Sequence, residues 1–168
     1  DFRAQAQTCG TQQFPAAPAL TWVEAVGDVA WFHSLDMAGA DTENHMGASA
    51  VERMRARGFD AGIAAENRKK TALPGNPQEA FNLWAADPEA CANIMNASFT
   101  NMGAGYAGHH DGIIMGAYWT QLLTAPRGND PAPSLTLNPT TATATIGGAA
   151  IAFTATLTNS VETINWTL

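Results

Sequence analysis

Apolar residues recur at three- and four-residue spacing from Leu20 onward, which is typical of one buried face of a helix. The positions on that face are Trp22, Val26, Val29, Ala30, His33 and Met37. Gly39 ends the pattern, so we predict a first helix between Leu20 and Gly39. Because His33 falls on the buried face, we interpret it as a core histidine hydrogen-bonded across the helices.

Further helices are predicted from their start signals. Ser49 and Glu52 form a capping box, in which each side chain pairs with an amide that the first helical turn leaves free. This helix ends near Gly58. Two more starts are predicted at Asn76-Pro77 and Asp87-Pro88, because Asn or Asp accepts from first-turn amides and proline has no amide to satisfy.

After the last of these helices the period of the pattern changes. Phe99 to Ala107 and Ile113 to Leu123 are rich in aromatic and branched residues, so they predict a hairpin around a five-residue loop. Residues 128–134 have the composition of a linker. Residues 135–168 alternate apolar and polar positions, which predicts short strands. Arg68-Lys69-Lys70 is interpreted as a solvated turn.

Composition limits the classes of partner. The chain has 168 residues, is 46% hydrophobic and carries a formal net charge of −7 with eight Lys and Arg. Nucleic-acid binding requires clustered basic residues, so no nucleic-acid partner is predicted. A spanning helix needs roughly 20 apolar residues, and because no such run occurs, no transmembrane segment is predicted.

The two cysteines, Cys9 and Cys91, are 82 positions apart and cannot form a CxxC motif. They form either a long-range disulfide or two unrelated thiols, and we favour the disulfide. Such a bond forms in an oxidising compartment, so it predicts a secreted or cell-surface protein.

Eight short pieces of sequence carry a family resemblance in order. They are Cys9-Gly10, His33 to Ala38, His45 before Gly47, Val51 to Phe59, Ala65-Glu66-Asn67, Trp84 to Met95, Gly103 to Tyr106, and Tyr118 to Gln121. With these pieces, residues 1–127 resemble the bacterial branch of the CAP superfamily, the SCP-like extracellular proteins. The resemblance implies an α+β fold, a three-layer α-β-α sandwich with a small antiparallel sheet. It also implies that a disulfide between Cys9 and Cys91 cross-links this fold.

Residues 135–168 resemble the opening strands of a bacterial immunoglobulin-like domain. Such a sandwich needs about 100 residues, so this all-β segment is incomplete. The predicted organisation is therefore a CAP domain at 1–127, a linker at 128–134 and a partial immunoglobulin-like domain at 135–168. Its exposed strand edges could pair with a neighbouring copy, which predicts self-association.

In this family two histidines and one or two glutamates face each other in a cleft that can hold a divalent metal. His45 and Glu66 match the first histidine and the first glutamate, whereas Ala90 stands where the second histidine is expected. Zinc normally needs three or four protein ligands. We therefore predict no cofactor, with weak zinc binding by His45 and Glu66 as the alternative. Glu89 and Asn93 complete the predicted cleft.

The predicted function is a secreted binding module, with a small apolar molecule, a cell-envelope component or a protein as ligand. No catalytic residue is assigned. One alternative is a metal- or carboxylate-dependent hydrolase of peptides or envelope glycans, in which Glu66 and Glu89 approach each other. A second is a structural adhesion module, whose cleft would be filled by side chains such as Met46 or Trp119. His45 and Glu66 could also belong to a buried network that only holds loops in place.

Overall fold

The computed structural model describes residues 2–43, 47–110, 115–128, 134–138 and 154–158. The chain divides into two compact units, Asp1–Gly128 and Asn129–Leu168. In the second unit, β7 (Ser134–Asn138) pairs antiparallel with β8 (Thr154–Thr158). The immunoglobulin-like assignment of that unit stays a prediction.

The first unit is built on a mixed sheet. The described residues form a four-stranded sheet in the order β3-β5-β6-β4. Its strands are β3 (Thr21–Trp22), β4 (Ala61–Thr71), β5 (Asn101–His110) and β6 (Met115–Pro126). The long strands run antiparallel and β3 runs parallel to β5. This sheet is the central layer of the first unit.

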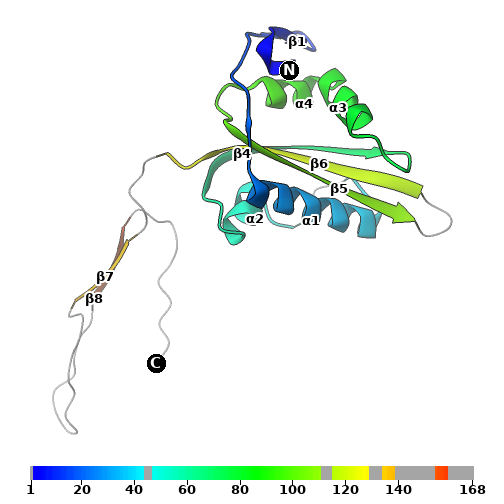
Figure 1. The fold of residues 1–168 in the computed structure, drawn as a ribbon. Coiled ribbons are helices and arrows are strands. Elements are labelled where there is room, and N and C mark those ends of the chain that lie inside the picture. Colours follow the sequence, from blue (N-terminus) through cyan, green and yellow to red (C-terminus); the bar gives the residue numbers. More distant parts are fainter. Residues whose placement is uncertain (1, 44–46, 111–114, 129–133, 139–153, 159–168) are drawn as a thin grey trace, which may run out of the picture. The chain divides into compact units, whose positions relative to one another are not determined.

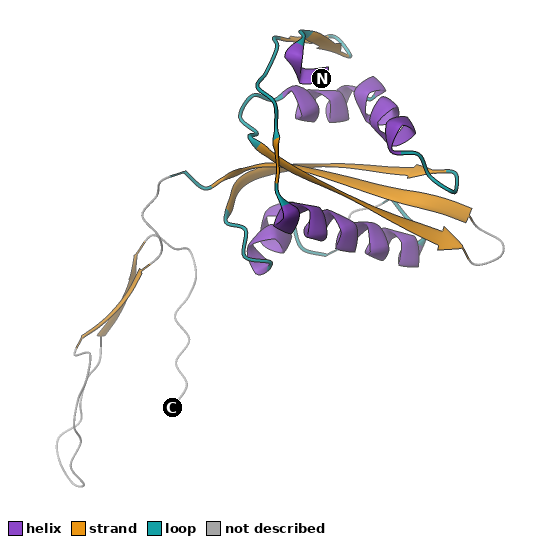
Figure 2. Cartoon of the chain, in the orientation of Figure 1, coloured by secondary structure: helices purple, strands orange, loops and turns teal. Residues whose placement is uncertain are grey.

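Helices cover both faces of this sheet. Helices α1 (Glu24–Ala40) and α2 (Ala50–Ala56) lie on one face, and α3 (Pro77–Ala86) and α4 (Pro88–Met95) lie on the other (Figures 1 and 2). Because successive strand residues point to opposite faces, Leu122 packs against α1 and α2 while Leu123 packs against α3 and α4. The predicted α+β fold class is confirmed.

The three helix starts predicted from capping residues are confirmed. The Ser49 side chain accepts from the amide of Glu52, whose carboxylate accepts from the amide of Ser49 at 2.8 Å. The side chain of Asn76 caps α3 at the amide of Gln78, and Asp87 caps α4 at two amides. None of the helices in the described part of the chain combines the length and apolarity needed to span a bilayer.

The disulfide between Cys9 and Cys91 is confirmed. It joins α4 to an N-terminal segment that contains a short 3-10 helix, Phe2–Ala4, and a hairpin of β1 (Gln7–Cys9) and β2 (Gln12–Phe14). The hairpin forms because Gly10 adopts a φ of +62°, a left-handed conformation that glycine tolerates without strain.

The first helix begins later than its periodicity predicts. It starts at Glu24, and the preceding Thr21–Trp22 forms β3. The amide of Thr21 bonds the carbonyl of Thr100, and the amide of Val23 bonds that of Met102. These bonds hold the segment in an extended conformation, which leaves Trp22 52% exposed rather than buried.

The interpretation of Arg68-Lys69-Lys70 as a solvated turn is wrong, because these residues lie within β4. The strand was missed because charged residues occupy both of its faces. Each of two cations has an anionic neighbour: Arg68 Nε lies 3.7 Å from Glu66, and Lys70 Nζ lies 2.5 Å from Asp41. These pairings allow a charged segment to form a partly covered strand.

Close packing of α1 on β5 gives a testable prediction. A methyl group added at Gly105 would lie 2.1 Å from the backbone nitrogen of Trp31. Overpacking of this kind costs about 3 kcal/mol, so Gly105→Ala should lower the free energy of unfolding by that amount in a urea titration. Gly39→Ala is the control, because open space surrounds Gly39 and alanine favours the helix by about 1 kcal/mol. Equal stability of the two variants would contradict this packing.

Candidate functional site

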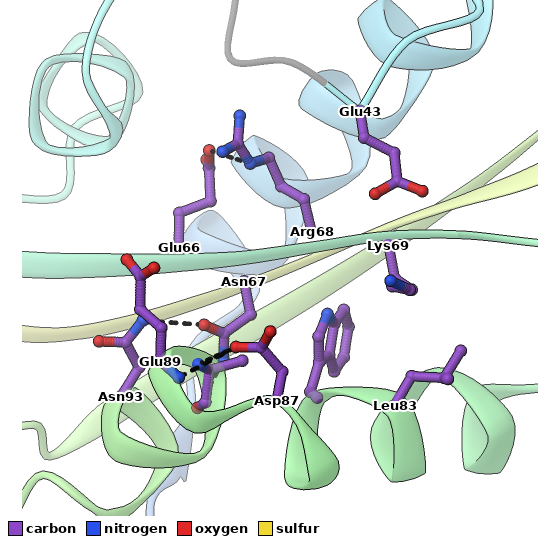
Figure 3. A pocket seen from close by; sticks show the side chains of 11 residues that line it. Glu43, Glu66, Asn67, Arg68, Lys69, Leu83, Asp87, Glu89 and Asn93 are labelled. Carbon is purple, nitrogen blue, oxygen red and sulfur yellow. Dashed lines mark hydrogen bonds and ion pairs between the residues drawn. The ribbon is translucent and has the colours of Figure 1, made fainter. Parts of the chain in front are cut away.

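A cavity of about 250 Å³ lies beside the middle of β4 (Figure 3). It is lined by Glu43, Glu66, Asn67, Arg68, Lys69, Leu83, Trp84, Asp87, Glu89, Ala90 and Asn93. The lining comes from β4, from α3 and α4, and from the segment that follows α1. Most of these side chains are polar or charged, so the cavity suits a polar ligand.

Alternation along β4 divides its lining residues between the two faces of the sheet. Glu66 and Arg68 lie on the side of α1, and Asn67 and Lys69 lie on the side of α3 and α4 (Figure 3). Glu89 extends from α4 towards the strand (Figure 3). The cavity therefore follows the edge of β4 and is lined from both faces.

Glu66 lies in a cluster of charged groups. Its Oε2 accepts a hydrogen bond from Nη2 of Arg53, and its Oε1 lies 3.3 Å from Nε2 of His33. Burial raises the pKa of the Glu66 carboxyl, but the hydrogen bond from His33 and the charges of His33, Arg53 and Arg68 outweigh it and lower the pKa. Glu66 is therefore ionised at neutral pH, and its carboxylate is fixed in position by Arg53 and His33.

His33 is buried, as predicted, with 1% of its surface exposed. Its Nε2 lies 3.3 Å from Oε1 of Glu66 on β4, and the predicted hydrogen bond across the helices stays a prediction. His33 does not line the cavity, although it contacts Glu66, which does. The buried face of α1 packs on the sheet rather than on another helix, so a polar residue on it meets a strand.

An amide network fixes the wall formed by α4. Asn93 donates to the side-chain oxygen of Asn67 at 2.9 Å, and Asn67 donates to Gln121 at 2.9 Å and to the carbonyl of Ala90 at 3.3 Å. Asn93 and Glu89, both predicted for the cleft, line the cavity together with Glu66. The methyl group of Ala90 lines it as well.

The segment leading towards His45 is anchored on the sheet. Asp41 pairs with Lys70 and accepts from the hydroxyl of Tyr118, and Glu43 accepts from the amide of Lys70 at 2.8 Å. The bonds to Asp41 raise the pKa of Lys70 above its ordinary range. His45 itself, like Met46, lies outside the described residues, so its place in the cleft stays a prediction.

The donors that the structure describes do not fit a zinc site. Both carboxylate oxygens of Glu66 already contact positively charged or donating groups, Arg53 and His33. Ala90 offers a methyl group where an imidazole would be required. Across residues 2–43, 47–110 and 115–128, no group of three His, Cys, Asp or Glu is placed to hold a metal ion.

Several site residues were not predicted. Arg53 and His33 hold Glu66, and Glu43 and Trp84 line the cavity. The helical period gave a usable signal for His33, because a buried histidine needs a partner. No local signal pointed to Arg53, because its partner lies on a strand that the sequence did not predict.

Trp119, expected to fill the cleft of a purely structural module, does not line the cavity. Its Nε1 donates to Thr71 Oγ1 at 3.0 Å, and its ring contacts that of Tyr106 at 4.6 Å between centroids. The cavity is therefore not closed by this side chain.

Comparison with known proteins places this arrangement in a family. Among solved structures, the chain is similar to an extracellular protein containing an SCP domain from Bacillus anthracis strain Ames, at 24% identity and a TM-score of 0.53. That match covers 64% of this chain and 34% of the other, so the chain spans about a third of that protein. No curated protein sequence matches.

The chain is also similar to an outer surface protein from Borrelia burgdorferi, at 12% identity and a TM-score of 0.56, over 66% of this chain and 80% of that one. At these identities the two structures establish a shared fold. Residues 15–123 match the sequence pattern of CAP, the cysteine-rich secretory protein family. Because this match spans well over half of the chain, the chain belongs to the CAP family.

Proposed function

We propose that the chain is a secreted or cell-surface binding module, and that its cavity takes a polar ligand from a cell envelope or a protein. Location outside the cell is supported by the disulfide, which persists in oxidising compartments. It is also supported by the two similar structures, which are described as an extracellular protein and an outer surface protein.

The observation that carries the binding proposal is the lowered pKa of Glu66, a carboxyl that lines a polar cavity. General acid catalysis needs a carboxyl whose pKa lies near the working pH. The charges around Glu66 act in the opposite direction and lower its pKa. The cavity therefore supplies hydrogen-bonding groups, such as Asn93 and Glu89, without a carboxylic acid on β4 that could donate a proton.

The polar lining also narrows the ligand class. A small apolar molecule would leave the carboxylates and amides of the cavity without water or partners, which is costly for buried polar groups. Sugars and peptides carry the hydroxyl, amide and carbonyl groups that such a lining can pair with. We therefore favour an envelope component or a protein segment over the apolar ligand of our initial prediction, and we propose that no metal takes part.

The proposal predicts that a soluble peptidoglycan fragment, a disaccharide carrying its short peptide, binds at α4. In NMR titrations of the ¹⁵N-labelled chain, the side-chain amides of Asn67 and Asn93 should shift and saturate. Asn93→Ala should weaken binding about fivefold or more, because a neutral hydrogen bond contributes about 1 kcal/mol. Asn82→Ala is the matched control, since Asn82 lies on α3 but does not line the cavity. If the fragment shifts the NMR signal of neither side-chain amide, the proposal fails.

The hydrolase alternative has one observation in its favour, because Glu66 and Glu89 line the same cavity. It predicts turnover of the fragment that Glu66→Gln abolishes, with the released products visible by mass spectrometry. Binding without turnover in both the unmodified chain and Glu66→Gln would reject the hydrolase.

A further inference from the structure

The outer edge of β4 is a candidate pairing surface. In an antiparallel pair, the N–H and C=O of one residue point to the same side, and the side alternates along the strand. The carbonyl of Thr124, the register partner of Ala64, accepts from Thr100 on the side of β5. Ala64 and every second residue after it, up to Lys70, therefore direct their backbone groups away from β6.

Side chains bond the backbone groups at the two ends of this edge, and the cavity lies beside the part between them. The amide of Lys70 is taken by Glu43 at 2.8 Å, and the carbonyl of Ala61 is taken by Arg55 at 2.8 Å. Between these points Arg68 lines the cavity. Within the described part of the chain, the outward backbone groups of Arg68 make no hydrogen bond. A strand added here would find both a donor and an acceptor.

A second observation points to a ligand with acceptor oxygens. Trp84 is 95% buried and lines the cavity, and its indole N–H has no acceptor among the described residues. Nη1 of Arg68, which is also a buried atom, has no acceptor among the described residues either. Buried donors without partners are rare in folded proteins. Of these two donors, Arg68 belongs to the strand whose outer edge is open, where the carbonyl groups of an added peptide would supply acceptors.

The charges of the cavity favour a cationic ligand. Four carboxylates line it, namely those of Glu43, Glu66, Asp87 and Glu89. Arg68 and Lys69 are the basic side chains of the lining, and Arg53 further balances Glu66. The carboxylates on the side of α4 therefore face few cations, and Glu89 extends from that side towards β4 (Figure 3).

We propose that the cavity binds an extended, positively charged peptide segment, which adds as a strand to the outer edge of β4 at Arg68 and directs a lysine or arginine side chain towards Glu89. In strand addition, backbone hydrogen bonds give affinity and alternate side chains give specificity. The inference rests on the proposed binding function and names the ligand class of that site.

The test compares three short peptides on the ¹⁵N-labelled 168-residue chain by NMR. Acetyl-Ala-Ala-Lys-Ala-Ala-amide should move the backbone amide of Arg68 downfield and slow its hydrogen exchange. The matched peptide with glutamate in place of lysine should bind about tenfold more weakly, because like charges repel. Acetyl-Ala-Pro-Lys-Pro-Ala-amide lacks two amide donors and should also bind about tenfold more weakly.

Variants of the chain test the charge contact. Glu89→Gln should lower the affinity for the lysine peptide about threefold, which is the range expected for a partly exposed ion pair. Glu79→Gln, on α3 and outside the lining, should leave its affinity unchanged. Equal binding of all three peptides, or no change at Arg68, would overturn the inference. If the peptidoglycan fragment still shifted Asn93 in that case, the proposed function would survive, and if it did not, both would fail.

Discussion

Reduction of the disulfide between Cys9 and Cys91 is expected to lower the free energy of unfolding by about 4.5 kcal/mol. The bond closes a loop of 82 residues, and the loss of loop-closure entropy in the unfolded chain predicts a cost of this size. Urea unfolding with and without a reducing agent measures it. The double variant Cys9→Ser with Cys91→Ser should match the reduced chain.

The structure around the disulfide explains why its loss should also affect the site. The buried guanidinium of Arg3 donates to the carbonyls of Ile94, Asn96 and Phe99, so the N-terminal segment holds the end of α4 as well. Because α4 carries Asn93, the reduced chain should show faster hydrogen exchange along α4 than along β6. A loss below about 1 kcal/mol, with α4 exchange unchanged, would show that the noncovalent contacts of the N-terminal segment, such as those of Arg3, hold it without the disulfide.

Replacement of Glu66 with alanine should cost about 3 to 5 kcal/mol of folding free energy. The side chain of Glu66 is 11% exposed and that of Arg53 is 15% exposed, and His33 lies fully inside. Removing one member of a buried ion pair leaves its partners desolvated and uncompensated, which is the costly case. Thermal and urea unfolding measure the loss. Glu89→Ala, on the exposed side of the same cavity, should change stability by less than about 0.5 kcal/mol.

The pH dependence of stability should follow the lowered pKa of Glu66. A carboxyl whose pKa is lower in the folded state binds fewer protons when folded, so its contribution is fully present above its unfolded pKa. That contribution decreases as pH falls below about 4.5, the ordinary value, and is gone below the lowered folded pKa. The difference between the unmodified chain and Glu66→Gln, measured by urea unfolding between neutral pH and pH 2, should shrink over this window. A constant difference would contradict the ion-pair cluster.

Much of the fold followed from local signals. The starts of α2, α3 and α4 and the β5–β6 hairpin were predicted because capping residues, prolines and changes of period act within a few positions. β4 was missed for the opposite reason. Its charged residues, such as Arg68 and Lys70, are covered by partners distant in sequence, and only the folded chain brings Asp41 beside Lys70.

The candidate site was predicted in part. Glu66, Glu89 and Asn93 came from matched family motifs, and the structure places all three on one cavity. The sequence could not show what holds Glu66, because Arg53 and His33 reach it from two different helices. Those two contacts contribute to the lowered pKa of Glu66, which the identity of Glu66 alone does not indicate.

Native mass spectrometry of the chain with the peptidoglycan fragment, combined with elemental analysis of the dialysed protein, tests the central claim most directly. We expect the fragment to bind with its mass unchanged, and the dialysed protein to carry no stoichiometric zinc. Release of cleaved fragment, or one zinc ion per chain that Glu66→Gln removes, would show that the cavity acts on its ligand rather than holding it.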